Sequence, residues 1–393
     1  MTVRMLEEKM ISIGILTYHK AKNYGAFLQA YGLSQRLNEE KDINAEIIDF
    51  SMKREKKRYK VGNNPIYIVK NFKQWNHYKR LYNGFEKGYK KAPISKDRCV
   101  SDSIEDFDNF VKNKYDIIIT GSDEVWRLKS FRGFPNPYWL PGEIKCKKVS
   151  YAAASSTSNF EKQPDDIKYK IIEYLNDFEY ITVRDKNTYN QISTIANYND
   201  RLEKMPDPSF VYDYKANGDK GRRILKEQFK ISSNDKIAIV MTENVKLQKM
   251  IGNVIGNTHK IVSVYDYADG FNNLSDITPF EWLDVIAGAD LVLASYFHAI
   301  CFSVLNNRRF LAFGTDAKKD KLTEVLESVN LEKFFVDIED ISEAILSEKI
   351  QFCIDEEYDC HKEINEQRDK FIYFVDILRT IGEKNERKQH WKQ

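Results

Sequence analysis

The chain has 393 residues, of which 42% are hydrophobic and 13% aromatic, and its formal net charge is only +2. This length predicts two domains, because single cores stop growing at roughly 250–300 residues. The five cysteines include no C-x-x-C pair, which argues against a disulfide framework or a zinc ribbon. Glu7 and Glu8 near the N-terminus, and the lack of an apolar stretch of ~20 residues, favour a cytoplasmic protein without a membrane span.

Apolar runs separated by helical patterns fill the first half of the chain. Strands are expected at residues 11–18, 43–50, 115–120, 147–153 and 179–183. Helical patterns occur after the first strand and at 165–178, so the segment opens as a βαβ unit. Such continuous apolar strands are typical of a mainly parallel sheet that helices cover on both faces.

A polar stretch at 212–223 predicts the boundary between two domains, since the same alternation of strands and helices resumes after it. The expected parts are a first domain at 11–213, a second at 222–352, and a C-terminal helix at 353–393 that packs back on the body. Both domains are predicted to be α/β, doubly wound and Rossmann-like. Their strand ends would face an interdomain cleft, where ligands of such folds bind.

Residues 53–98 form a strongly basic segment within the first predicted domain. They contain 15 Lys or Arg against three acidic residues, a local net charge of +12, and eight aromatic residues are interleaved with them. This composition suits an anionic surface such as lipid head groups. No nucleic-acid-binding motif accompanies the charge, so we expect no nucleic acid partner and instead a peripheral contact with the inner face of the cell membrane. The alternative is a solvated insertion whose aromatic residues pack on the domain.

Two motifs in the first half place polar residues at the end of a predicted strand. In NYGAFLQAYGL, Asn23, Tyr24 and Gly25 stand where a strand turns into a helix, and backbone N–H groups there attract anions or hydroxyl-rich ligands. A plain tight turn explains Gly25 equally well. In YDIIITGSDEVWR, Asp123 is placed to hold a sugar hydroxyl or remove its proton, and Trp126 to stack on a sugar. The alternative for Asp123 is a helix N-cap.

Two further motifs bring an arginine and a histidine to the same kind of position. Arg184 directly follows the strand in YITVRD, and its guanidinium suits a carboxylate or phosphate; a surface ion pair is the alternative. His298 in SYFHAICFSVLNN enters the first turn of a helix, where the dipole opposes a positive imidazole and favours a neutral group for acid–base work or an anion contact. A core histidine bonded to backbone is the alternative. Asp207 and Pro208 in MPDPSFVY are interpreted as a strand end or interdomain turn that shapes the chain.

Seven motifs covering about residues 12–315 occur in the order found in one known family: ILTYHKAKNYGAFLQAYGL, IIDF, TGSDEVW, VSYAAASS, ITVRD, PDPSFVY and SYFHAICFSVLNNRRF. Together they resemble the polysaccharide pyruvyl transferase family. The resemblance implies a fold similar to the two-Rossmann-domain arrangement of GT-B glycosyltransferases. It also implies transfer of the enolpyruvyl unit of phosphoenolpyruvate to two hydroxyls of a sugar in a surface polysaccharide, such as an exopolysaccharide or capsule, or in its glycan precursor. The products would be a pyruvate ketal and free phosphate.

The resemblance assigns roles to individual residues. His298 and Asp123 are the expected catalytic groups, because the donor's methylene carbon must be protonated and the attacking hydroxyl benefits from a base. The expected donor site comprises Arg184, His298, Tyr296, Lys318, Lys321, Asn23 and Gly25. The expected site for the acceptor, a sugar or lipid-linked oligosaccharide, comprises Asp123, Trp126 and Tyr24. Arg184 and His298 are expected to project into one anion-holding pocket in the cleft, and no metal ion or cofactor is implied besides the donor.

The chain departs from the family pattern at two positions. Tyr296 stands where some members carry arginine, and Ala299 replaces the glycine that follows the histidine. Lys318, Lys319 or Lys321, just after the FLAFG strand, is expected to supply the missing cation. Two other functions fit the sequence: a glycosyltransferase of the same architecture that uses a nucleotide sugar, and a non-catalytic glycan-binding protein.

Overall fold

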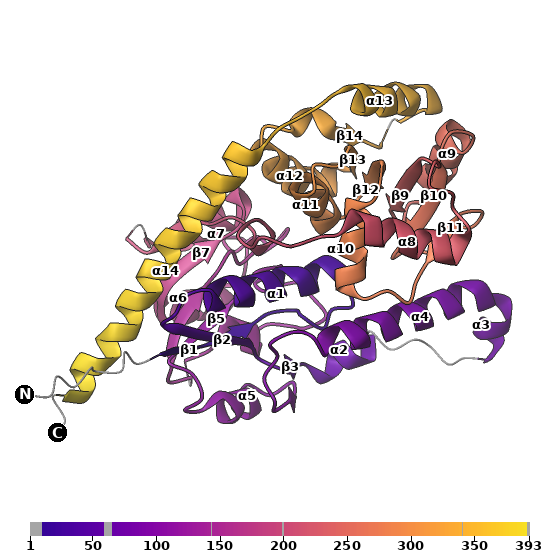
Figure 1. The fold of residues 1–393 in the computed structure, drawn as a ribbon. Helices are drawn as coiled ribbons and strands as arrows, with labels where there is room; N and C mark the ends of the chain where they lie inside the picture. The colour runs from indigo at the N-terminus through magenta and orange to yellow at the C-terminus, as the bar shows by residue number, and fades with distance from the viewer. Residues whose placement is uncertain (1–9, 59–64, 143, 199, 340, 391–393) are drawn as a thin grey trace, which may run out of the picture.

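Two six-stranded parallel sheets, one in each half of the chain, organise the structure (Figure 1). The computed structural model describes residues 10–58, 65–142, 144–198, 200–339 and 341–390. The strand order is β2-β1-β5-β6-β7-β8 in the first sheet and β11-β10-β9-β12-β13-β14 in the second. Each order starts from an inner strand and winds outward in both directions, which confirms the predicted doubly wound α/β fold. The parts around the two sheets are called the first and the second lobe below.

The strands are short, and four of the inner ones, β5, β9, β12 and β13, are buried along their whole length. The first sheet contains β1 (Ile11–Leu16), β2 (Ile43–Ile47), β5 (Ile117–Thr120), β6 (Lys147–Ser150), β7 (Phe178–Val183) and β8 (Leu202–Lys204). The second contains β9 (Ile237–Met241), β10 (Lys260–Val264), β11 (Asn272–Leu274), β12 (Leu291–Ala294), β13 (Phe310–Gly314) and β14 (Phe335–Asp337). A small separate pair joins β3 (Phe50–Ser51) to β4 (Cys99–Val100). Every residue of β5, β9 and β12 is buried, because helices cover both faces of each sheet.

Helices connect the strands and cover the sheets. In the first lobe they are α1 (Tyr24–Asn38), α5 (Ile104–Val111), α6 (Asp165–Asn176) and α7 (Lys186–Ile195). In the second lobe they are α8 (Gly218–Phe229), α9 (Val245–Ile255), α10 (Pro279–Ala287), α11 (Phe297–Leu305), α12 (Asp316–Glu327) and α13 (Glu343–Asp355), and the chain ends in α14 (His361–His390). Short 3₁₀ segments occur at Pro137–Trp139, Pro208–Phe210 and Glu332–Phe334. None of the helices in the described parts of the chain is both long and apolar enough to cross a bilayer.

Helix α14 returns from the second lobe to the first sheet (Figure 1). Its Phe371 and Phe374 rings lie 5.4 and 4.8 Å from the ring of Tyr151 and join the core of that sheet. The predicted boundary after residue 352 falls inside α13, and the polar stretch 212–223 includes the first residues of α8. Composition marks these two boundaries, whereas α8 runs across residue 222 and α13 across residue 352.

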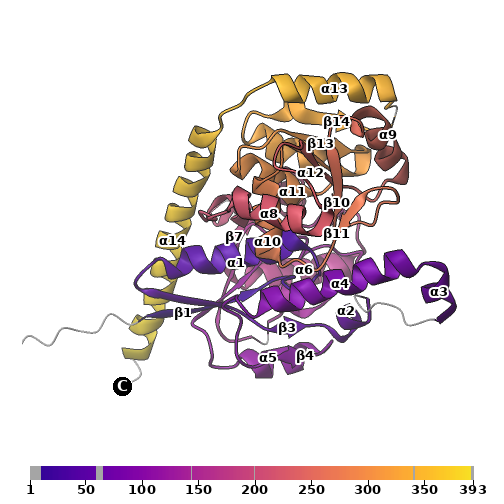
Figure 2. The same ribbon diagram turned by 45° about the vertical axis from the view of Figure 1, so that its right-hand side comes forward.

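The basic segment 53–98 consists mainly of α2 (Lys53–Arg58), α3 (Pro65–Lys70) and α4 (Phe72–Tyr89). Although its chain connections are to the first lobe, α4 runs along the second lobe (Figures 1 and 2). Phe85 and Tyr89 belong to the same core as the strands of the second sheet. Residues 59–64, which include Tyr59, and the side chain of Tyr67 lie outside the described residues.

Candidate active site

A cavity of about 120 Å³ lies where the carboxyl ends of strands from both sheets face each other. We call it the aromatic cavity. It is lined by Asn23, Tyr24, Gly25, Asp123, Met241, Tyr265, Trp282, Tyr296, Phe297, His298, Ala299 and Lys321. The structure thereby brings together most of the predicted site residues, namely Asn23, Tyr24, Gly25, Asp123, Tyr296, His298 and Lys321.

The starts of α1 and α11 touch each other at Gly25. A Cβ added to Gly25 would lie 2.0 Å from the Cβ of His298, so no larger residue fits without moving one lobe against the other. Asn23 caps α1, because its side-chain oxygen accepts a hydrogen bond from the N–H of Ala26 at 3.1 Å. The space above Gly25 is therefore filled by His298 from the other lobe, and the side-chain oxygen of Asn23 is engaged within its own helix.

Asp207 brings the predicted arginine and histidine together. Its Oδ2 accepts a hydrogen bond from Arg184 Nη1 at 2.9 Å and lies 3.7 Å from His298 Nε2. Its Oδ1 accepts a hydrogen bond from the N–H of Ser209 at 3.0 Å. None of the three side-chain partners is more than 9% exposed. A guanidinium from the first lobe and an imidazole from the second thus meet on one buried carboxylate.

Asp207 and Arg184 are both held in their charged forms. Burial disfavours an ionised Asp207, but the side chain of His298 and the guanidinium of Arg184 outweigh burial and hold the Asp207 pKa well below its usual range. Burial also disfavours the Arg184 cation, whereas Asp207 and Asp123 raise the Arg184 pKa above its ordinary value. Nε2 of His298 is buried and makes no hydrogen bond within the described part of the chain. It is therefore one polar atom of the cluster that can still form a hydrogen bond with a ligand.

A second cavity, of about 160 Å³, adjoins the first because Phe297 and Lys321 line both. We call it the cationic cavity. It is lined by Arg184, Asp185, Lys204, Met205, Pro206, Asp207, Phe210, Phe297, Lys321, Glu324, Val325, Ser328, Gln367 and Lys370. Arg184 Cζ and Lys321 Nζ lie 4.6 and 5.0 Å from the centroid of the Phe297 ring. Arg184 thus lines the cationic cavity and His298 the aromatic one, so the expectation that both project into a single pocket is wrong.

Charged contacts join the lobes beside both cavities. Lys321 Nζ on α12 lies 3.3 Å from Glu124 Oε1 in the loop after β5, and Glu324 on the same helix pairs with Lys204 at the end of β8. Burial would raise the Glu124 pKa, but nearby cations, Lys321 first and then Arg184, lower it to about 2. Glu124 therefore stays ionised and holds Lys321 at the boundary of the two cavities.

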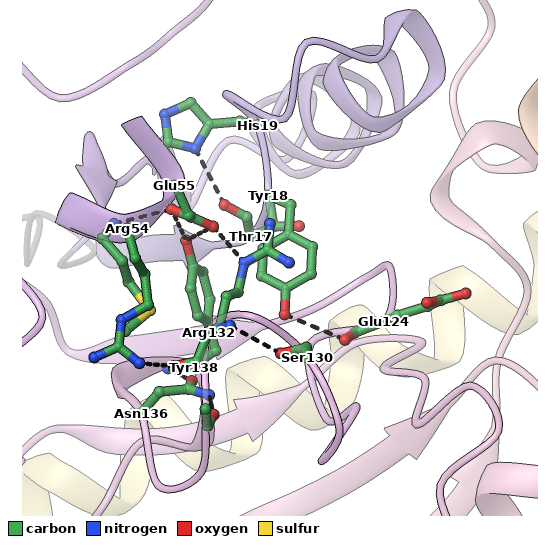
Figure 3. A network of polar contacts seen from close by, with 12 residues as sticks. Thr17, Tyr18, His19, Arg54, Glu55, Glu124, Ser130, Arg132, Asn136 and Tyr138 are labelled. Carbon is green, nitrogen blue, oxygen red and sulfur yellow. Dashed lines mark hydrogen bonds and ion pairs between the residues drawn. The ribbon is translucent and has the colours of Figure 1, made fainter. Parts of the chain in front are cut away.

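A network of polar contacts holds the loop after β5 in place (Figure 3). Arg132 forms an ion pair with Glu55 of α2, and its Cζ lies 3.4 Å from the centroid of the Tyr18 ring. The hydroxyl of Tyr18 donates to the backbone oxygen of Glu124 at 3.2 Å, and that of Tyr138 donates to Glu55 Oε2 at 3.3 Å. The network ties the first helix of the basic segment to the cavity loop.

A sequence model described as polysaccharide pyruvyl transferase matches residues 23–317, a range that includes the whole Asp207 cluster. The chain belongs to the polysaccharide pyruvyl transferase family. The match confirms the resemblance inferred from the seven motifs. Comparison with curated proteins returned no match.

Solved structures that resemble this family member include two UDP-GlcNAc 2-epimerases. The enzyme from Methanocaldococcus jannaschii has a TM-score of 0.56 and 8% identity, covering 93% of this chain and 100% of that chain. The enzyme from Neisseria meningitidis, bound to UDP-GlcNAc, has a TM-score of 0.54 and 9% identity, covering 94% of this chain and 100% of that chain. At such low identity the likeness concerns the fold alone. It confirms the predicted GT-B-like arrangement of two Rossmann-like domains.

Where this chain departs from its family's pattern, Tyr296 places a phenol in the aromatic cavity. The hydroxyl of Tyr296 donates to Asp266 Oδ1 at 3.1 Å, and its ring makes an edge contact with that of Tyr265 at 5.3 Å. Of the three lysines expected to replace the missing arginine, Lys321 lines both cavities. Lys319 is exposed, and the side chain of Lys318 lies outside the described residues.

Trp126 lines neither cavity. Its ring is fully buried and stacks on Trp139 at 5.7 Å, and its backbone N–H donates to the oxygen of Ala154 at 3.0 Å. The prediction that Trp126 stacks on an acceptor sugar is therefore wrong, because the loop after β5 folds back into the core of the first lobe. The ring of Trp282 on α10, which stacks on Tyr24 at 5.5 Å, lines the aromatic cavity instead.

Three candidate functional residues escaped the sequence analysis: Asp207, Trp282 and Phe297. The interpretation of Asp207 and Pro208 as a shaping turn is incomplete, because the carboxylate is also the meeting point of the two lobes. The PDP sequence among the seven motifs was the available signal. Trp282 and Phe297 sit in apolar helical patterns that look like ordinary core, so no local signal marks them.

Proposed function

We propose that this chain transfers the pyruvate unit of phosphoenolpyruvate to two hydroxyls of one sugar in a surface polysaccharide, such as an exopolysaccharide or capsule, or in its precursor, as a ketal. Family membership supports polysaccharide pyruvylation in general. The observation that carries the finer proposal is the meeting of Arg184 and His298 on Asp207, beside a cavity that also holds Asp123. No cofactor is proposed besides the donor.

The reaction requires two proton transfers that the site residues can serve. Two C–O bonds form at C2 of the donor while its C–O bond to phosphate breaks. The two sugar hydroxyls lose one proton each. One of these protons is balanced by the proton that the methylene carbon gains when it becomes a methyl group, and the other leaves with phosphate. We assign His298 to protonation of the methylene carbon and Asp123 to the hydroxyl. The backbone N–H of Glu124 donates to Asp123 Oδ1 at 2.8 Å and orients that carboxylate.

Several hydrogen-bond donors of the protein lie near the boundary of the two cavities and suit an anionic substrate. Tyr296, the residue before α11, makes no side-chain cap, so the first N–H groups of this helix remain for a ligand. Lys321 lines both cavities. Arg184 donates one N–H to Asp207, and a guanidinium carries five, so it retains donors for a carboxylate or phosphate.

The aromatic cavity suits the acceptor. Its walls include the rings of Tyr24, Tyr265 and Trp282, and flat aromatic faces pack well against the apolar face of a sugar ring. We propose that the acceptor is a lipid-linked oligosaccharide and that the reaction takes place in the cytoplasm, at the inner face of the membrane.

The proposal is tested by incubating the full chain with phosphoenolpyruvate and lipid-linked glycans from the source cell. We expect phosphate release together with a mass gain of one pyruvyl ketal on the glycan. The variant His298→Gln, which keeps a polar side chain of similar size, should bind the glycan but release phosphate about 10²–10⁴-fold more slowly. Glycan binding without release by either protein would instead identify a non-catalytic family member.

A glycosyltransferase that uses a nucleotide sugar is the second candidate, since the similar Neisseria meningitidis structure holds UDP-GlcNAc. That function predicts stabilisation by a nucleoside diphosphate and none by phosphoenolpyruvate. At ligand concentrations near 100 times Kd the difference is about 2.7 kcal/mol, which thermal unfolding resolves. Stabilisation by phosphoenolpyruvate alone would exclude this candidate.

A further inference from the structure

The second half of α4 is anchored on the second lobe. A Cβ added to Gly84 would lie 2.2 Å from the backbone oxygen of Ile277, and one added to Gly88 would lie 2.4 Å from Cδ of Pro279. Two glycines one helical turn apart thus allow the backbone of α4 to approach the start of α10 closely. Side chains at these positions would force the helix away from the second lobe.

Residues in both halves of α4 contact residues that line the aromatic cavity. His77 Nε2 donates to the backbone oxygen of Tyr265 at 3.1 Å, and burial lowers the His77 pKa, which favours the neutral ring. The ring of Phe85 stacks on that of Tyr24 at 4.6 Å. Since Tyr24 and Tyr265 line the cavity, the basic segment is packed directly behind the acceptor site proposed above.

The first turn of α4 and the short helix α3 project beyond this anchor (Figures 1 and 2). Ile66, Val69 and Phe72 expose 69%, 80% and 58% of their surface. Lys70 and Lys73 stand next to them in the chain, Lys79 and Arg80 follow along α4, and all four are exposed with no carboxylate within ion-pair distance among the described residues. An exposed apolar tip with adjacent cations is unusual for a surface that only faces water.

We propose that this tip, Ile66–Lys73, docks on a lipid bilayer that contains anionic lipids. Exposed apolar side chains enter the boundary between head groups and acyl chains, and nearby lysines are attracted to the negative surface. A soluble anionic glycan would use the lysines but leave the exposed valine and phenylalanine in water. The bilayer is the partner that satisfies both features.

The inference deepens the proposed function, because it assigns where a lipid-linked acceptor is presented. Phe72 at the tip and Phe85, which packs behind Tyr24 of the cavity, are separated by 13 residues of continuous helix, which corresponds to about 20 Å. Helix α4 would thus hold the aromatic cavity at a fixed height above the membrane and lead an acceptor from its lipid towards Tyr24.

The test measures sedimentation of the full chain with vesicles of phosphatidylcholine, with and without phosphatidylglycerol. We expect binding only to the anionic vesicles. The docking variant combines Val69→Ser, Lys70→Gln and Lys73→Gln, and it should weaken binding about tenfold or more, since each lysine near an anionic surface counts for about fivefold.

A matched control carries Tyr169→Ser, Lys162→Gln and Lys170→Gln, on and next to α6 on the first lobe. It removes one large exposed hydrophobic residue and two exposed lysines, as the docking variant does, and should bind anionic vesicles like the unchanged chain. Equal binding by the docking variant and the control, or no binding of the unchanged chain to anionic vesicles, would overturn the proposal. A change in oligomeric state confined to the docking variant, without a change in vesicle binding, would show that the tip contacts a second copy instead.

Vesicle binding is measured without donor or acceptor, so its outcome does not depend on the proposed reaction. Phosphate release with a water-soluble acceptor should be the same for the docking variant and the unchanged chain, because the tip lies outside the cavities. A chain that binds vesicles but releases no phosphate would refute the reaction and leave the docking surface standing.

Discussion

The aromatic and cationic cavities share Phe297 and Lys321 but differ in their chemistry. The aromatic cavity gathers rings around His298, whereas the cationic cavity gathers lysines and Arg184 around Asp207. Groups suited to holding a sugar and groups suited to holding an anion are thus separated by one wall. The difference shows that the site is a pair of compartments joined at a charged boundary.

The two cavities also differ in their place in the chain. All lining residues of the aromatic cavity except Lys321 fall within the family match at residues 23–317. The cationic cavity takes a large part of its lining from α12 and α14, after the match ends. We therefore expect changes around His298 to affect the reaction itself, and changes around the cationic cavity to affect binding and the contact between lobes.

The largest effect is expected for His298→Gln, which removes the imidazole of the aromatic cavity. The rate of phosphate release at saturating donor should fall by about 10²–10⁴-fold, as expected for loss of a general acid. The control is His361→Gln, at an exposed histidine at the start of α14. If the His298→Gln variant keeps most of its kcat, His298 takes no part in the reaction, and the proposed difference between the two cavities is wrong.

The second-largest effect is expected at Asp207, the carboxylate on which Arg184 and His298 meet. Asp207→Asn leaves the buried Arg184 cation without its carboxylate, so the free energy of unfolding should drop by about 3–5 kcal/mol in denaturant titrations. The double variant with Arg184→Met should recover part of that loss, because it no longer buries an unpaired charge. Asp213→Asn, at an exposed carboxylate nearby, should be nearly neutral. Equal stability of Asp207→Asn and Asp213→Asn would contradict the pairing.

A smaller effect is expected where the lobes touch in the aromatic cavity. Gly25→Ala inserts a methyl group against His298 and should cost about 1–3 kcal/mol of stability, with reduced phosphate release. Gly252→Ala in α9 is the control, since its Cβ would come no closer than 3.2 Å to the Phe271 ring and alanine favours the helix. A Gly25 variant as stable as the control would show that the lobes separate easily.

The smallest effect concerns the boundary pair of Glu124 and Lys321. The Glu124 pKa is lowered from 4.5 to about 2, so the carboxylate contributes stability that is complete above pH 4.5 and lost as the pH falls towards 2. Glu124→Gln should therefore lower stability by about 1–2 kcal/mol at neutral pH and flatten its acid dependence in that window. Glu327→Gln, at an exposed position of α12, should leave the acid dependence unchanged.

Much of the fold could be predicted because the inner strands carry their signal locally. Runs such as IAIVM and LVLA are apolar at every position, as strands buried on both faces must be. The edge strands β8, β11 and β14 have only three residues each and include polar or charged side chains, so no apolar run marks them. Their pairing depends on the neighbouring strands of the complete sheet and not on a local sequence pattern.

The sequence predicts most residues of the candidate site but fewer of the contacts between them. Asn23, Asp123 and His298 follow strands, and parallel strands bring their carboxyl ends to one edge, so their meeting at one cavity follows from the pattern. The burial of Trp126 depends on a loop that turns back into the core. The role of Asp207 depends on partners from both lobes. Neither is visible in a local stretch of sequence.

The shared packing of α4 has a consequence for how the molecule unfolds and moves. Phe27, Phe85 and Tyr89 come from the first half of the chain, yet they complete the core around the second sheet. A fragment that begins at α8 would therefore expose that apolar surface and should not fold by itself. The two lobes should therefore unfold in one cooperative transition. They should not open about a hinge as widely as loosely tethered domains do.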